Sequence, residues 1–488
     1  MDSNQKPKVK ENLTKAKKSK EERDAAAVAA QLEGYVTKTG ICFDPNRGRY
    51  YLRDSRGVWV GYSDRHVDDV LARYGVPLEA ASDRKDVAVA AHLTEHSRFN
   101  RVIDMAMPLC GRKSGFMTFA GRSVLVTTEA HLIEPKAGEW TLTRAFIGGL
   151  LGSRSEPHAQ TQMHTFFGWL QRAVLSLRSG EATQAQALVL AGEHNSGKTT
   201  AAKLIVKALG GRHAAPLAYM SGASEFNADL FGAEVLVVDD EALSNRSADR
   251  EKLAHQLKQM CVTGSARYHS KGVDATMLPT WWRVVFALND NAKSLQVLPP
   301  LVEGVRDKII ILKGSTRTES KFPAGTSEAE IDAAYEAELP AFLHWLLHDF
   351  KVPPEMRNER FGIETWHHPE PAEILMSLDD EAQLLSLIDE ADNSLFKAGN
   401  VVWVNVWVGT ATQAHRLLAD DAKTASALLR LVKVPSRIGE ILKRLCVSNP
   451  ERVSFNRTNK DRLYTIRRQM ADGTIASLPE EESALTSP

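Results

Sequence analysis

The most regular hydrophobic pattern lies in the middle of the chain, where long apolar runs end in polar residues. These runs cover residues 187–191, 235–238 and 284–288 and are rich in Val, Leu and Ala. Continuous apolar runs of this length are typical of strands that are buried on both faces of a parallel sheet. A helical pattern at 201–209 follows the first run after a short turn. We therefore predict an α/β core in this part of the chain.

Shorter alternating runs, separated by turn sequences, precede this core and predict a small α+β module. No predicted strand of this module carries a catalytic pair of aspartates, so the module lacks a primase signature. Arg47, Arg49, Tyr50 and Tyr51 could clamp a nucleic-acid strand, although aromatic residues of hairpins more often belong to the core. The elements that we expect are strands at 41–43, 49–52, 58–60, 116–119 and 123–127, with helices at 67–74 and 97–106.

Helical patterns flank the core at 158–180 and 327–349, and prolines and adjacent histidines then interrupt the pattern over 353–371. The adjacent histidines lack metal-ligand spacing. A last group of patterns looks like a winged helix, with Arg437, Lys443 and Arg444 facing a groove and Arg457 and Lys460 at the tip of the wing. A winged helix that binds protein is the alternative. The elements expected in this group are helices at 383–391, 410–419 and 436–445, and strands at 401–407, 452–455 and 462–466.

These patterns divide the chain into six parts. Both ends are poor in apolar residues and are expected to be disordered, and the first of them is rich in lysine. The parts are a flexible basic arm (1–30), an N-terminal α+β module (31–145), a nucleotide-binding domain with its preceding packing helices (146–320), a helix and linker (321–375), a winged-helix-like domain (376–470) and a tail (471–488).

The composition is that of a soluble globular protein, with 43% hydrophobic and 25% charged residues. Lys+Arg and Asp+Glu both number 61, so a nucleic-acid surface has to be a local patch. Cys42, Cys110, Cys261 and Cys446 are far apart and fit a reducing cytoplasm. No apolar run could span a membrane and no secretory signal is present, so we expect a cytoplasmic protein.

The first apolar run ends in a phosphate-binding pattern, with Gly192 and Gly197 bounding a turn and Lys198 and Thr199 opening a helix. Glycines let the backbone turn its N–H groups around phosphate oxygens, and the helix N-terminus adds positive charge. Lys198 is expected on the β- and γ-phosphates and Thr199 on Mg²⁺. The alternative is a chance match in a Gly/Ser-rich turn. The residues expected to bind ATP are Gly192, Asn195, Ser196, Gly197, Lys198, Thr199 and Thr200.

The other two apolar runs also end in polar residues. In open α/β sheets, ligands bind at the carboxyl ends of the strands, which is where these residues lie. One of Asp239 and Asp240 is expected to hold Mg²⁺, and Glu241 to polarise the attacking water. Asn289 could orient the same water and sense the γ-phosphate. The alternatives are an acidic turn after a core strand and an Asn-Asp turn.

Between these two runs, a helix ends at Gly264 and a short β-type segment turns at Lys271 and Gly272. Basic residues at a hairpin tip suit contacts with the backbone of a single strand. A solvated surface hairpin is the alternative interpretation.

The order of these motifs along the chain resembles that of superfamily 3 helicases. The motifs are the glycine-lysine-threonine turn, the Val235–Glu241 stretch, the basic hairpin and the strand that ends at Asn289. The likeness covers about residues 160–315 and is to the primase-helicase proteins of phages, plasmids and large DNA viruses. It implies a P-loop AAA+ ATPase core that hydrolyses ATP with Mg²⁺ between the subunits of a homo-oligomeric ring, typically a hexamer, with single-stranded DNA in its central channel.

The resemblance also assigns roles to single residues. Lys198 and Thr199 match the phosphate-loop pair, and Asp240 and Glu241 match the acidic pair, with Asp239 as the competing choice. Asn289 matches the sensor. The DNA-contacting hairpin would carry His269 and Lys271, and the arginine that acts on the neighbouring subunit's nucleotide would be Arg306, with Arg283 as the second choice.

Our leading interpretation is therefore an ATP-dependent DNA helicase or translocase in the replication of a phage or other mobile element. A DNA-binding initiator or defence-type ATPase that assembles on DNA without unwinding is the alternative, and a small-molecule kinase is the third. A separate primase or polymerase and duplex DNA at the C-terminal domain are further partners to consider. No membrane partner is expected.

Overall fold

The computed structural model places most of the chain and shows two compact units. The first comprises 1–241, 255–288 and 307–366, and the second comprises 242–254, 289–306 and 367–488. The residues described are all except 1–28, 79–88, 154–155, 240–246, 272, 302–303, 316–321, 323–324, 379, 391–393, 398–400, 404, 433–435, 458–461, 471–473 and 477–488. No helix in the described part is long and apolar enough to cross a membrane.

A five-stranded sheet forms the centre of the first unit, in the order β13-β7-β12-β9-β8. The pairs β13–β7, β12–β9 and β8–β9 are parallel. The predicted apolar runs form three of these strands, and nearly all of their residues are buried, which confirms the α/β core. The strands are β7 (Ala187–Gly192), β8 (His213–Ala214), β9 (Val235–Asp239), β12 (Arg283–Asn289) and β13 (Ile309–Gly314).

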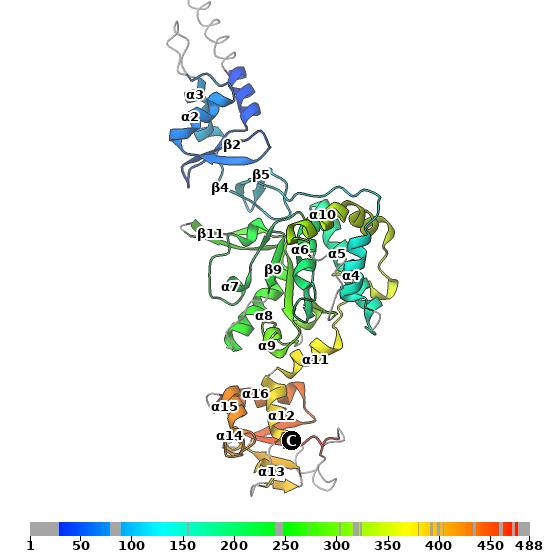
Figure 1. Ribbon diagram of the computed structural model, residues 1–488. Helices are drawn as coiled ribbons and strands as arrows, with labels where there is room; N and C mark the ends of the chain where they lie inside the picture. The colour runs from blue at the N-terminus through cyan, green and yellow to red at the C-terminus, as the bar shows by residue number, and fades with distance from the viewer. Residues whose placement is uncertain are drawn as a thin grey trace, which may run out of the picture. The chain divides into compact units, whose positions relative to one another are not determined.

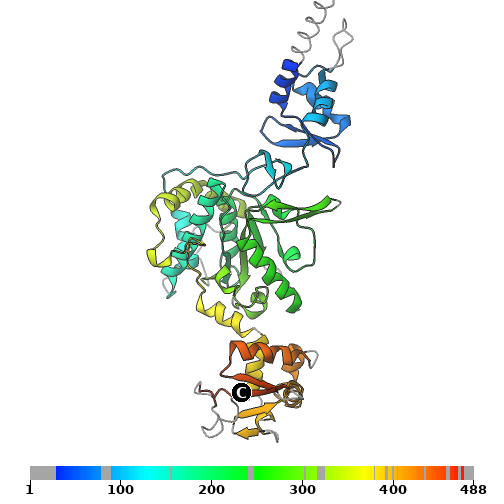
Figure 2. The ribbon, with the colours of Figure 1, turned by 180° about the vertical axis from the view of Figure 1, so that it is seen from behind.

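Helices cover this sheet, and Figures 1 and 2 show α4, α5 and α10 grouped beside α6 on one side of it. A cluster of aromatic rings joins α4, α5 and α10. The ring of Trp140, which precedes α4, lies 5.1 Å from that of Phe342 of α10, between centroids. The ring of Phe167 of α5 lies 5.0 Å from that of Trp345, which directly follows α10. The helices and helical turns that follow the N-terminal module in this unit are α4 (Thr141–Leu151), α5 (Ala159–Ser179), α6 (Lys198–Ala208), α7 (Leu217–Met220), a short 3₁₀ turn η1 (Leu230–Gly232), α8 (Ser247–Val262, shared with the second unit) and α10 (Glu328–His344) with a π-helical turn η3 (Trp345–Asp349) and a 3₁₀ turn η4 (Pro354–Met356).

The expected helix at 327–349 begins where its sequence signal predicts. The Ser327 side chain accepts a hydrogen bond from the backbone of Glu330, and the Glu330 carboxylate accepts one from the backbone of Ser327. This capping box satisfies backbone donors that the first turn leaves unpaired. The carboxylate of Glu338 in the same helix caps α4 by accepting from the N–H groups of Leu142 and Thr143.

Two small three-stranded sheets, β1-β2-β3 and β4-β6-β5, precede this core. One expected element is wrong: the helix near 97–106 ends at Asn100, and residues 105–107 form a strand because they are buried and pair in parallel with β6. Tyr50 and Tyr51 are core residues. The elements are β1 (Cys42–Asp44), β2 (Arg49–Arg53), β3 (Trp59–Tyr62), α2 (Asp64–Arg73), α3 (Val89–Asn100), β4 (Met105–Met107), β5 (Gly115–Phe119) and β6 (Arg122–Val126).

The second unit contains a four-stranded sheet in the order β14-β15-β17-β16. The single strand expected at 401–407 is two strands, because Asn405 adopts a left-handed φ of 64° and turns the chain. The stretch expected to interrupt the pattern contains the start of α11 at Pro369, where proline suits the first turn. The elements are α9 (Ala292–Leu295), η2 (Arg306–Lys308, shared with the first unit), α11 (Pro369–Ser377), α12 (Asp380–Glu390), α13 (Ser394–Lys397), β14 (Val401–Trp403), β15 (Val406–Gly409), α14 (Ala411–Ala419), α15 (Ala425–Leu431), α16 (Ser436–Ser448), β16 (Val453–Arg457) and β17 (Arg462–Arg467).

Candidate functional site

The turn between β7 and α6 has the backbone that a phosphate-binding loop needs. Asn195 and Gly197 both have left-handed φ angles, of 62° and 100°, and Gly197 caps α6. Asparagine and glycine are the residues that tolerate this conformation best. A Cβ atom on Gly192 would lie 3.0 Å from Ser196 Oγ and from Gly314 O, so the turn is too tight there for a side chain. The loop therefore fits a group that binds through backbone N–H groups.

Lys198 is folded against this loop. Its Nζ donates to the carbonyl oxygens of Gly192 (3.0 Å) and Glu193 (2.7 Å) and lies 3.4 Å from Ser196 Oγ. Only 6% of the residue is exposed. The ammonium group is thus fixed within the turn, at the N-terminus of α6, where anions are favoured.

The next residue, Thr199, is exposed and faces the end of β9. Its Oγ1 donates to Asp239 Oδ1 at 3.3 Å. A hydroxyl and a carboxylate at this position fit Mg²⁺, which is usually held by one or two carboxylates together with phosphate oxygens and water. Of the two competing aspartates, the structure describes Asp239, whereas Asp240 and Glu241 lie outside the described residues.

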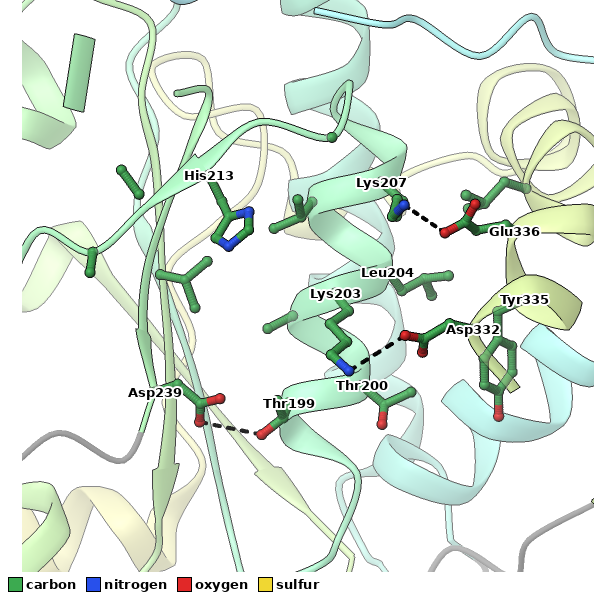
Figure 3. Close-up of a pocket in the computed structure, with 17 residues that line it drawn as sticks. Thr199, Thr200, Lys203, Leu204, Lys207, His213, Asp239, Asp332, Tyr335 and Glu336 are labelled. Carbon is green, nitrogen blue, oxygen red and sulfur yellow. Dashed lines mark hydrogen bonds and ion pairs between the residues drawn. The ribbon is translucent and has the colours of Figure 1, made fainter. Parts of the chain in front are cut away.

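A cavity of about 530 Å³ begins at Thr199 and Asp239 and follows α6 towards its C-terminus. Figure 3 shows two ion pairs between α6 and α10 along its wall, Lys203 with Asp332 (3.5 Å) and Lys207 with Glu336 (2.6 Å). Because one end of the cavity is formed by Thr199 and Asp239, solvent and ions can reach that pair from the surface.

The remaining predicted catalytic residues belong to other elements. Asn289 is the last residue of β12. Arg306 begins the 3₁₀ turn η2; its side chain is exposed, and its carbonyl oxygen accepts a hydrogen bond from His367 Nε2 at 3.2 Å.

The second choice for the arginine acting in trans does not suit that role. Arg283 is 2% exposed, its guanidinium donates to Thr183 Oγ1 (2.9 Å) and Trp282 O (2.9 Å), and it lies over the ring of Trp281. Burial lowers the pKa of Arg283 to about 9. A side chain held in this way inside its own subunit cannot reach a neighbouring one.

The predicted basic hairpin is present as β10 (Ser265–Ser270) and β11 (Val273–Pro279), which pair antiparallel. Lys271 is exposed in the turn, and Gly272 lies outside the described residues. His269 is half-buried and its ring lies 5.0 Å from that of Phe226. Lys271 is therefore free to meet a ligand, and His269 is partly covered.

Sequence reasoning missed the residue that anchors this hairpin. Asn227 is 1% exposed. Its Nδ2 donates to Arg267 O (2.8 Å), its Oδ1 accepts from His269 N (2.8 Å), and its backbone N–H donates to His269 O (3.1 Å). Asn227 lies in a loop far from β10 in sequence, and only its buried amide, paired on both sides, identifies the role.

In the second unit, two arginines expected to face a groove are paired within the unit. Arg437 Nη2 lies 2.8 Å from Asp380 Oδ2, and Arg444 Nε donates to Glu381 Oε1 at 2.9 Å. α12 supplies both carboxylates, whose positions the sequence pattern could not give, and the expected groove stays a prediction. Arg457 is exposed at the end of β16, and Lys460 lies outside the described residues.

Comparisons with known proteins support the fold. Residues 190–298 match the model of a family described as a family of unknown function (DUF5906), which is less than half of the chain. A search of the curated proteins finds no significant match. An apo structure of the NrS-1 C-terminal region (305–718) is similar with a TM-score of 0.52 at 10% identity, over 88% of this chain and 96% of that one. The A form of the same region gives a TM-score of 0.50 at 12% identity, over 87% and 95%.

A structure described as the active helicase Cch of SCCmec type IV has a TM-score of 0.29 at 12% identity, over 84% of this chain and 73% of that one. A TM-score this low does not show that the two folds are alike. The likeness to the NrS-1 region is a likeness of fold, and it agrees with the mixed α/β architecture and its parallel five-stranded sheet.

Proposed function

We propose that this chain is an ATP-hydrolysing DNA helicase or translocase that serves the replication of a phage or other mobile element. The observation that carries the proposal is the turn between β7 and α6, where Lys198 and the pair Thr199 and Asp239 meet at the carboxyl edge of a parallel sheet. Ligands bind at this edge in open α/β folds.

In this proposal, the loop binds the phosphates of ATP, and Lys198 exchanges its bonds to two loop carbonyls for bonds to phosphate oxygens. Thr199 and Asp239 hold Mg²⁺, which neutralises phosphate charge when it is bound. Glu241 orients and deprotonates the attacking water, and Asn289 senses the γ-phosphate. Transfer to water needs such a base near the γ-phosphate.

The parts of the proposal that concern DNA and assembly rest on the order of the motifs. Lys271 at the tip of the β10–β11 hairpin, with His269 beside it, contacts a single strand in the channel of a homo-oligomeric ring, taken to be a hexamer. Arg306 acts on the nucleotide of the neighbouring subunit. The C-terminal domain, with the strand order β15-β17-β16 and helices α12, α14 and α16, is winged-helix-like and contacts duplex DNA through Arg457 and Lys460 or binds protein, such as a separate primase or polymerase.

The test is an ATPase assay with and without single-stranded DNA, followed by strand displacement, on the unmodified chain and on Lys198→Ala. We expect single strands to stimulate hydrolysis and the chain to displace a paired strand. Lys198→Ala should lose hydrolysis and displacement, because no other side chain of the loop carries a permanent positive charge.

The matched control is Lys207→Ala on the same helix, which removes an ion pair with Glu336 at half-exposed positions and should leave hydrolysis unchanged. Hydrolysis that DNA stimulates without any displacement would favour the initiator or defence-type ATPase. Phosphate transfer to a small molecule, with no response to DNA, would favour a kinase and overturn the proposal.

A further inference from the structure

A second cleft, of about 680 Å³, lies in the first unit, and none of its lining residues belongs to the phosphate-binding loop or to the β10–β11 hairpin. Three parts of the chain form it: the turn between β2 and β3, the segments that flank the β5–β6 hairpin, and the C-terminal end of α5. We call it the basic cleft and define it by Arg53, Arg56, Arg112, Lys113, Glu129 and Arg178.

The charge of this lining is strongly one-sided. Five permanently positive side chains and one carboxylate, that of Glu129, line the cleft, and His131 adds a titratable group. Asp54 and Glu134 lie beside the lining and pair with Arg56 and Arg178. With these two carboxylates counted, five positive and three negative charges leave a net charge of +2. The chain as a whole has 61 basic and 61 acidic residues and a net charge of zero. Like charges gathered in a cleft repel one another and raise the local concentration of anions. The basic cleft is therefore a local patch of the kind that a neutral chain needs in order to bind nucleic acid.

The positive groups of the cleft differ in how open they are to a ligand. Arg178 has 23% of its side chain exposed, pairs with Glu134 at 3.7 Å and donates to the carbonyl oxygen of Ile133. Arg112 is half-buried and Lys113 is exposed, and neither has a carboxylate within ion-pair distance among the residues that the structure describes. Arg56 pairs with Asp54 at 2.9 Å, but its side chain is 79% exposed, and such a surface pair is worth little. The Glu129 carboxylate accepts a hydrogen bond from the backbone N–H of Ser114 at 2.8 Å, which partly offsets its negative charge.

The walls of the cleft are fixed to the core by a buried ion pair. The Arg212 guanidinium pairs with the fully buried Glu234, and it also donates to Thr128 O (3.0 Å) and Leu109 O (3.2 Å). Glu234 Oε1 accepts from the N–H of Gly111, the residue before Arg112. The loop that carries Arg112 and the segment at Thr128 are thus held together before any ligand arrives, which lowers the entropic cost of binding.

Gly111 is a required part of this frame. Its φ is 63°, and a Cβ atom there would lie 2.5 Å from the Cβ of Trp281. A glycine is needed for the loop to pass this close to the core and present Arg112 and Lys113 to the cleft.

We propose that the basic cleft binds the sugar-phosphate backbone of a single DNA strand at a site separate from the β10–β11 hairpin. Four of the five cations are arginines, which bind phosphate oxygens through two parallel hydrogen bonds. They come from three separate elements and so can meet successive phosphates. A cleft in the size range of small-ligand pockets accommodates a few nucleotides of one strand rather than a duplex. This inference rests on the proposed action on DNA.

The test measures the affinity of a fluorescein-labelled single-stranded oligonucleotide for the full chain between 50 and 200 mM NaCl. Arg112→Ala/Lys113→Ala should bind more weakly, and its salt slope should fall by about 1.4, from about 0.7 for each phosphate contact on a single strand. Over this fourfold range of salt, the unmodified chain should therefore lose about sevenfold more affinity than the variant. Lys113→Glu, at an exposed position that leaves Arg112 in place, should change affinity in the same direction.

The matched control is Arg65→Ala/Arg122→Ala, which removes two exposed charges from the same unit outside the cleft and should keep the original slope. An equal loss of oligonucleotide affinity in both double variants, or no loss in either, overturns the inference. The proposed function is kept in that case as long as DNA still stimulates hydrolysis. If Arg112→Ala/Lys113→Ala instead weakens binding of a fluorescent ATP analogue and spares the oligonucleotide, the cleft takes a free triphosphate and the inference is wrong. A chain that neither binds the oligonucleotide nor hydrolyses ATP overturns the proposed function and the inference with it.

Discussion

The first two side chains of α6 have different environments, although they are adjacent in sequence. Lys198 is buried against carbonyl oxygens of its own loop, and Thr199 is exposed towards a carboxylate at the end of β9. A helix places neighbouring residues about 100° apart, so one side chain can serve the phosphates while the next serves the metal. The difference in environment therefore supports separate roles for the two residues.

Asp239 is the carboxylate that we expect to matter for magnesium. Asp239→Asn keeps the size of the side chain but replaces an anionic oxygen that accepts from Thr199 at 3.3 Å. Losing a partner that only orients a metal ligand typically costs about 10–100-fold in metal affinity, so loss of a carboxylate that holds the metal should cost at least as much. We expect the Mg²⁺ concentration that gives half-maximal ATP hydrolysis to rise by at least that factor, measured by titration at fixed ATP.

Asp332→Asn is the control, because Asp332 lies along the same cavity and pairs with Lys203 rather than with Thr199. Its titration should match that of the unmodified chain. If the Mg²⁺ titration of Asp239→Asn also matches that of the unmodified chain, the carboxylate that holds Mg²⁺ is that of Asp240.

At the residue scale, the sequence predicts those side chains whose role depends on a local pattern. The glycine-lysine-threonine turn is such a pattern, and its backbone is as expected. Arg283 and Arg437 could not be interpreted in this way, because their partners Thr183 and Asp380 lie 100 and 57 residues away in the chain. Whether an arginine is free or paired is a property of tertiary packing.

At the element scale, strands were predictable where burial on both faces leaves an unbroken apolar run, as in β7, β9 and β12. The predicted helix at 97–106 takes in the first two residues of β4, because a strand of three residues is too short to show a period. The turn at Asn405 was missed, since only its left-handed backbone distinguishes two short strands from one.

The β10–β11 hairpin depends on an anchor outside itself. Asn227→Ala removes two side-chain hydrogen bonds, one to Arg267 O and one from His269 N, at a buried position. Leaving such groups unpaired costs about 1–3 kcal/mol. We expect amide hydrogen exchange to accelerate across 265–270, and DNA stimulation of hydrolysis to fall while basal hydrolysis remains.

Lys271→Ala is the comparison for this variant. It should lose DNA stimulation in the same way but keep slow exchange, because Lys271 is exposed in the turn. If exchange in the hairpin is unchanged in Asn227→Ala, the two strands hold the hairpin by themselves and Asn227 is not its anchor.

At the scale of the whole molecule, the chain passes between its two units more than once. Lys198 belongs to the first unit, and Asn289 and Arg306 belong to the second, as do the segments 242–254 and 289–306 that follow β9 and β12. The sequence pattern groups residues 146–320 as one domain, and that division stays a prediction beside the two compact units. Long-range contacts, rather than order along the chain, decide which residues belong to which unit.

Arg306 provides the test of assembly. Its side chain is exposed at the start of η2, and Arg283, the other arginine considered, is buried and paired. An arginine supplied by a neighbouring subunit stabilises charge in the transition state and is worth about 10³–10⁵ in rate. Arg306→Ala should therefore bind a fluorescent ATP analogue normally and lose hydrolysis by about that factor. Arg357→Ala, at another exposed position, should bind the analogue normally and keep hydrolysis.

Mixing two inactive variants separates a shared site from a site within one chain. In an assembly of Arg306→Ala and Lys198→Ala subunits, some interfaces pair an intact phosphate loop with an intact arginine, and those interfaces should hydrolyse ATP. We expect activity to appear on mixing, to pass through a maximum as the ratio is varied, and to be absent from either variant alone. If mixed assemblies form, as shown by co-purification of differently tagged subunits, and no ratio restores hydrolysis, then Arg306 does not act across an interface.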